Sequence, residues 1–173
     1  MFSLFFDGIQ RDLQIAILPP VLCALFRLLF IEIYRAKKSP LGEWRKWYHC
    51  FRYGFWWGMD LNAYFFLLLV LLVSLPGAFL PFYYSVGDTI RQVVVTMYAI
   101  AIYTAFLGKM IFYYHYHDIF NSTLWLGKNA EKHNLLDIFF HQDHGALLLL
   151  SYIPYTLLCW WAGKVFMLIP QLP

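Results

Sequence analysis

The chain has 173 residues, of which 61% are hydrophobic and only 13% charged, and its formal net charge is +3. Soluble domains are closer to half apolar and a quarter charged, and a chain of this size cannot enclose so much apolar surface in its own interior. The composition therefore excludes a water-soluble fold and indicates an integral membrane protein, and its one cluster of basic residues, without a nucleic-acid-binding motif, predicts no nucleic-acid partner.

The first apolar run extends over about 13–34. This is roughly 22 residues, enough for a helix that crosses about 30 Å of hydrocarbon. Pro19 and Pro20 fall in its first turns, where a missing amide donor costs little. A basic stretch follows, with a turn at 39–42, and its cations are Arg35, Lys37, Lys38, Arg45, Lys46 and Arg52.

Aromatic and basic residues alternate in the segment 44–57. On a helix, four of its rings form one apolar stripe: Trp44, Tyr48, Phe51 and Phe55. Placing Arg45, Lys46 and Arg52 at mid-depth would cost roughly 2.5–3.5 kcal/mol each, whereas each gains about 1 kcal/mol beside anionic lipid. We therefore predict an interfacial helix, steeply inclined to the spans, that binds lipid phosphates.

Two further apolar runs predict the second and third spans, at about 61–82 and 90–114. We expect Pro76 to kink or end the second span, and residues 85–88 to form the turn between the two. Arg91 and Lys109 lie near opposite ends of the third span. Their long stems predict that both charges reach the nearest membrane surface.

The longest polar insertion, about 115–145, separates the third span from the fourth, at about 146–169. Within it, residues 135–140 predict a short amphipathic helix at the surface. The sequence thus predicts an all-α fold, a polytopic transmembrane helical bundle of about four spanning helices with interfacial amphipathic helices. We treat residues 1–173 as a single membrane domain.

Few residues in this chain are candidates for chemistry. Arg27 lies within the first apolar run, so it either extends to the interface or binds a lipid headgroup or a partner. The six histidines lie at predicted membrane edges and lack a metal-ligand spacing; they are His49, His115, His117, His133, His141 and His144. We expect no catalytic residue, no metal site and no cofactor within the chain.

Two stretches resemble a known family. Residues 51–61 place aromatic residues and glycines before an Asp60–Leu61 pair, and residues 113–121 include Asp118 and Asn121 among aromatic residues. Both are similar to the N-terminal membrane region of the lipoteichoic acid synthase-like family, although Trp56 stands where that family usually has glycine. These enzymes transfer phosphoglycerol or phosphoethanolamine groups between lipids and envelope glycans.

The resemblance implies a bacterial cytoplasmic (inner) membrane protein that anchors the enzyme and presents its lipid substrate. Membrane phospholipids would be its partners, and Arg27, Arg45, Lys46 and Arg52 its headgroup-binding residues. Asp60, Asp118 and Asn121 match the family's polar positions, for which helix capping is the alternative. The family's metal-dependent extracytoplasmic catalytic domain and fifth span are absent here, so the chain is either a fragment of a longer enzyme or a stand-alone relative.

Two alternatives remain open, a non-enzymatic membrane subunit or lipid-binding regulator and, less favoured, a small transporter component. The orientation is also open. Counting Lys and Arg places the basic loop in the cytoplasm, whereas the family resemblance implies that this loop faces outward. We favour the family orientation, in which basic side chains outside the cell hold lipid phosphates near a catalytic domain.

Overall fold

The computed structural model describes residues 2–34, 44–117, 140 and 144–168. Almost all of these residues are helical, and no strand occurs among them. The elements, in chain order, are α1 (Phe2–Ala16), α2 (Leu18–Tyr34), α3 (Trp44–Leu69), the π-helix η1 (Val70–Ser74), α4 (Leu75–Phe79), α5 (Pro81–Tyr116) and α7 (Gly145–Met167).

These elements form four stretches that are long and apolar enough to cross a membrane: Leu4–Tyr34, Trp44–Phe79, Ser85–Tyr116 and Gly145–Met167. The all-α fold and the four predicted spans are confirmed. The first stretch begins nine residues before the predicted boundary, because α1 continues into α2 with a break only at Ile17. Pro19 and Pro20 lack the amide donors that would cross this break, so the helix is interrupted there.

The second stretch contains α3, η1 and α4, and its π-helix precedes Pro76. Pro76 has no N–H to donate to the preceding turn, and its ring crowds the carbonyl there. The neighbouring Leu75 N–H instead reaches five residues back, to the carbonyl of Val70. The predicted perturbation at Pro76 thus takes the form of a local widening of the helix, which continues to Phe79.

The chain reverses at Leu80, and the prediction of a turn at 85–88 was wrong. Leu80 is extended, with φ −117° and ψ 112°, and Pro81 begins α5. A residue before proline is driven towards extended backbone, while proline itself suits the first position of a helix. Residues 85–88 therefore continue the first turns of α5.

The segment 44–57 is not a separate inclined helix, so that prediction was also wrong. It is the first half of α3, which continues without a break to Leu69. Of the predicted aromatic stripe, Trp44 and Tyr48 are exposed on the outside of the bundle. The less exposed face carries Trp47, Phe51 and Gly54, because glycine lets a neighbouring helix approach closely.

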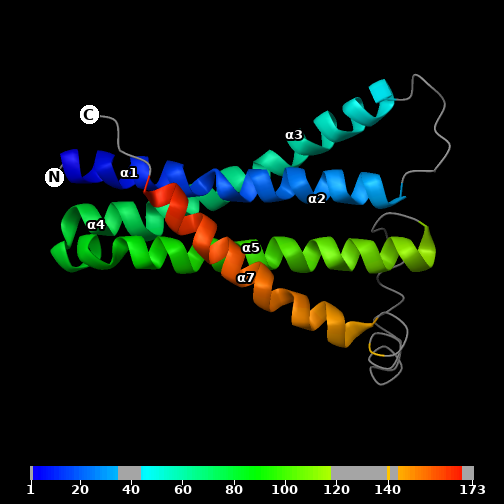
Figure 1. Cartoon of the computed structure of the whole chain (residues 1–173). Coiled ribbons are helices and arrows are strands. Elements are labelled where there is room, and N and C mark those ends of the chain that lie inside the picture. Colours follow the sequence, from blue (N-terminus) through cyan, green and yellow to red (C-terminus); the bar gives the residue numbers. More distant parts are fainter. Residues whose placement is uncertain (1, 35–43, 118–139, 141–143, 169–173) are drawn as a thin grey trace, which may run out of the picture.

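In Figure 1, α1, α2, α4 and α5 lie roughly along one axis, with α5 beside the other three. The N-terminal part of α3 diverges from α2, and α7 crosses α5 obliquely. A narrow core between them includes Ile15, Leu69, Val95 and Cys159, and the Phe65 and Tyr98 rings stack with centroids 4.1 Å apart. Most other large apolar side chains are exposed on the outer faces. A bilayer is the solvent that such a surface requires.

Hydrogen bonds between helices supplement this small core. The Tyr34 hydroxyl donates to the Met110 carbonyl at 2.9 Å, and the Tyr155 hydroxyl to the Ala99 carbonyl at 2.9 Å. The Gln92 side chain donates to the Trp160 carbonyl at 2.8 Å, which joins α5 to α7. Polar contacts of this kind hold helices together where lipid removes the hydrophobic driving force.

The bundle has two distinct ends (Figure 1). The turn end carries the Leu80 reversal, the first turns of α5 and the N-terminal part of α1. At the loop end, α2 and α5 finish and α3 and α7 begin. Both long polar connections therefore join the helices at the loop end. This agrees with four spans that alternate in direction. The predicted short helix at 135–140 lies in residues of which only Phe140 is described.

Candidate functional site

A buried ion-pair network joins α1, η1 and α5 at the turn end. Arg91 is 5% exposed, Ser74 1% and Asp12 0%. The Arg91 Nε donates to Asp12 Oδ1 at 2.5 Å, and its Nη2 donates to Ser74 Oγ at 3.0 Å. The Ser74 hydroxyl donates in turn to Asp12 Oδ2 at 2.5 Å. Each of the three polar groups is thus bonded to the other two.

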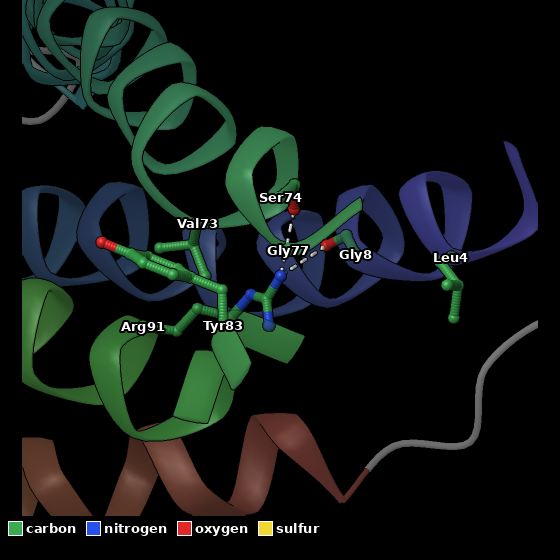
Figure 2. Close-up of a pocket in the computed structure, with 7 residues that line it drawn as sticks. All are labelled: Leu4, Gly8, Val73, Ser74, Gly77, Tyr83 and Arg91. Carbon is green, nitrogen blue, oxygen red and sulfur yellow. Dashed lines mark hydrogen bonds between the residues drawn. The ribbon is translucent and has the colours of Figure 1, made fainter. Parts of the chain in front are cut away.

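Two more groups complete this network. The Arg91 Nη2 also donates to the Gly8 carbonyl at 3.3 Å, as Figure 2 shows, and Nη1 donates to Asp88 Oδ1 at 3.1 Å. Asp88 accepts a further bond from Arg11, which lies next to Asp12 in the chain. Two arginines and two aspartates cancel in charge, so the network carries no excess charge into the membrane domain.

Small residues make room for the buried guanidinium. A Cβ at Gly8 would lie 2.7 Å from Ser74 Oγ, and one at Gly87 would lie 3.0 Å from Arg91 Nη1. The π-helix brings Ser74 to the same point, beside a small cavity that Tyr83 also lines (Figure 2). The arrangement is built for Arg91 itself and offers little space for a ligand.

The prediction that Arg91 extends to the membrane surface was therefore wrong. Its partner Asp12 is 79 residues away in the chain and lies just before the predicted start of the first span, so sequence reasoning did not pair them. The signal that could have found the network is the recurrence of Arg and Asp in two short segments, Arg11–Asp12 and Asp88–Arg91. Equal and opposite charges beside apolar runs favour mutual pairing.

Arg27 occupies a different setting, at the crossing of α2 and α3. Its guanidinium lies against Gly54, in the space that a Cβ at this position would fill. Arg27 therefore does not simply extend along α2 towards the membrane surface. Among the described residues, none forms a hydrogen bond or ion pair with its guanidinium.

A second group also lacks an acceptor within the described part of the chain. The Trp47 Nε1 is buried and has no hydrogen-bond partner there. Trp47 precedes Gly54 by seven residues, two turns of helix, so the two residues share one face of α3. The face of α3 that receives the Arg27 guanidinium thus also carries an unbonded N–H donor.

The structure does not bring the other predicted headgroup-binding residues to this crossing. Arg45 and Arg52 are exposed and seven residues apart, so they share one face of α3. Gly54 follows Arg52 by two residues and faces the opposite way. Lys46 is also exposed. Two surfaces of α3 therefore carry the candidates, an outer one with Arg45 and Arg52 and an inner one against Arg27.

Of the three polar residues that match the family, only Asp60 lies within the described residues. Asp60 is exposed on α3, two residues before Asn62, whose amide bonds to the Gly58 carbonyl at 3.1 Å. Asp118 and Asn121 lie outside the described residues. Over the described ranges, no three His, Cys, Asp or Glu side chains gather as metal ligands would.

The described fold and composition place this chain in a broad class, that of all-α proteins with four helices able to span a membrane. Comparison with known proteins adds no narrower assignment. No family model, no curated protein and no solved structure matches the chain.

Proposed function

We propose that this chain is the multi-pass membrane domain of a lipoteichoic acid synthase-like phosphoglycerol or phosphoethanolamine transferase in the bacterial cytoplasmic membrane. In this role it anchors the enzyme and presents an anionic lipid headgroup at the loop end. The chemistry belongs to an extracytoplasmic catalytic domain. The support is the resemblance of residues 51–61 and 113–121, together with the charge distribution of the described helices.

One observation carries the proposal, the composition of the outer face of α3. Arg45, Tyr48, Arg52 and Trp56 follow one another at helical spacing, and all four are exposed. Cations bind lipid phosphates, and amphipathic rings settle at the level of the headgroups. This face therefore has the chemistry of a surface that contacts anionic lipid.

The length of the second apolar stretch supports the placement of this cationic face among the lipid headgroups. Trp44–Phe79 has 36 residues, which corresponds to about 54 Å of helix against about 30 Å of hydrocarbon. With the leucine-rich stretch in the hydrocarbon, the first turns of α3 extend into the headgroup layer. The cationic face can thus meet phosphates without an inclined interfacial helix.

The turn end is a poor alternative for lipid binding. Its two arginines, Arg11 and Arg91, both form ion pairs with aspartates. A phosphate there would have to displace a carboxylate that already satisfies a buried guanidinium, which is costly. The contrast supports the proposal that headgroups bind at the loop end.

The test is lipid selectivity in nanodiscs. We expect the purified chain to enrich phosphatidylglycerol over phosphatidylcholine in its surrounding lipid, and the Arg45→Gln/Arg52→Gln variant to enrich it at least several-fold less. Lys164→Gln is the matched control, because Lys164 is also exposed but lies in the last turn of α7. Equal enrichment by the double variant and the wild type would contradict the proposal.

The transferase part needs a separate measurement. The chain is joined to an extracytoplasmic phosphotransferase domain of the family, and transfer of labelled phosphoglycerol or phosphoethanolamine from lipid is followed. Transfer that depends on Arg45 and Arg52 supports the enzyme. Lipid selectivity without any dependence of transfer on these residues would favour the non-enzymatic regulator instead.

A further inference from the structure

We propose that the crossing of α2 and α3 holds one phospholipid headgroup, with the Arg27 guanidinium on its phosphate and the Trp47 indole N–H on a second headgroup oxygen. This inference rests on the proposed function, since it names the inner site at which a presented lipid is held. It is distinct from the outer face of α3, which carries the exposed Arg45 and Arg52.

The first argument is that the position of Arg27 is built into α3. Gly54 leaves open the space that the guanidinium fills, and any side chain at Gly54 would compete for it. Arg27 lies seven residues before the end of α2 at Tyr34, or about 10 Å along the helix. A cation that only sought water would extend towards that end rather than pack sideways on a neighbouring helix.

The second argument is the excess of donors. Arg27 has five N–H groups and the Trp47 indole one, and these find no acceptor among the described residues. The buried Trp47 N–H is costly without an acceptor, and the Arg27 guanidinium carries a positive charge, so an anionic ligand that only accepts hydrogen bonds is favoured. Phosphate oxygens meet these demands, and arginine binds them bidentately.

The third argument separates a lipid from free phosphate. Trp47 and Gly54 are seven residues apart on one face of α3, a distance of about 10 Å along the helix. An inorganic phosphate is too small to serve donors spread over this distance, whereas a phospholipid headgroup also offers glycerol and ester oxygens. The exposed apolar surface of the surrounding helices suits the acyl chains.

A pair of glycine substitutions tests the site without changing any charge. Gly54→Ala places a methyl group where the guanidinium lies, so we expect it to release the lipid. Gly58→Ala is the matched control, since it lies one turn further along α3 and its Cβ would have nothing within 4 Å. Both changes raise helix propensity equally, so loss of lipid by Gly54→Ala alone reports on the crossing.

The measurement is native mass spectrometry of the full chain, released from nanodiscs that contain phosphatidylglycerol and phosphatidylcholine. We expect one retained phosphatidylglycerol on the wild type and on Gly58→Ala. Retention should fall about tenfold or more on Gly54→Ala and Arg27→Lys, as for the loss of a hydrogen bond to a charged group. Trp47→Phe should lower it less, and all variants should keep the wild-type helical circular dichroism.

Three results would overturn the inference. The first is equal retention by Gly54→Ala and Gly58→Ala, with the outer-face double variant alone impaired, which would leave the proposed function intact. The second is binding of inorganic phosphate alone at this site with no lipid retained, which would replace the lipid by a free anion. The third is the absence of any anionic-lipid preference in the wild type, which would remove the proposed function as well.

Discussion

Arg91 and Arg27 both lie within helices that are able to span a membrane, yet their surroundings differ completely. Arg91 donates to two aspartates, a serine and a backbone carbonyl. Arg27 rests on a glycine without an ion pair from the described residues. The same residue type therefore forms an ion-pair network at the turn end and packs against a glycine at the crossing of α2 and α3. A charge in an apolar run marks a site, but only its partners show what kind.

The first prediction concerns which end of the bundle faces outward, the turn end or the loop end. The answer is all-or-none. After replacement of Cys23, Cys50 and Cys159, the Ser39→Cys variant should react with an impermeant thiol reagent in intact cells. Ser39 belongs to the connection between α2 and α3, so labelling places the loop end outside, as the proposed function requires. Labelling only after lysis would support the charge rule and place the basic connection in the cytoplasm.

The largest effect on stability is expected from the turn end. Asp12→Leu leaves the Arg91 guanidinium buried without its main counter-ion, so the free energy of unfolding should fall by about 3–5 kcal/mol. Asp12→Leu/Arg91→Leu removes both charges and should recover much of this loss. Thermal unfolding in detergent measures both, with Asp60→Leu as an exposed control. A double variant no more stable than the single one would mean that the pair matters beyond its charge balance.

The sequence predicted the four spans because hydrophobicity and length are local properties that a bilayer selects directly. It did not predict the turn-end network, because Asp12 and Ser74 become partners of Arg91 only when three helices pack. The reversal at Leu80 was missed for a related reason. Gly87–Asp88 has the composition of a turn, but Pro81 starts the helix earlier and Gly87 serves to admit Arg91.

Arg27 was found from sequence because a cation among apolar residues is conspicuous. Its contact with Gly54 was not foreseen, since the two residues lie on different helices and glycine gives no chemical signal of its own. Spacing predicted that the segment 44–57 is helical, but it did not show that the less exposed face of α3 follows Gly54, where the Arg27 guanidinium packs.

Replacing each arginine by lysine should separate the two roles. Arg91→Lys keeps the charge but loses the planar guanidinium, which donates to four acceptors at once. The free energy of unfolding should therefore fall by about 2 kcal/mol. Arg27→Lys should change stability by no more than about 0.5 kcal/mol, because the structure gives the guanidinium no ion pair to lose. Unfolding curves and lipid retention, measured on the same samples, check both. A destabilising Arg27→Lys with unchanged lipid retention would make Arg27 a structural residue like Arg91.

The smallest effects compare single hydroxyl groups at the two ends. Ser74→Ala removes a hydroxyl that bonds both Asp12 and Arg91, and hydrogen bonds to charged groups are worth about 1.5–3 kcal/mol. Tyr34→Phe removes one neutral bond to the Met110 carbonyl, and such bonds between membrane helices average about 0.6 kcal/mol. The phenyl ring also keeps its packing against Phe30 and Tyr113. We therefore expect unfolding in detergent to be shifted clearly by Ser74→Ala and barely by Tyr34→Phe. The reverse order would mean that the loop end, and not the ion-pair network, holds the helices together.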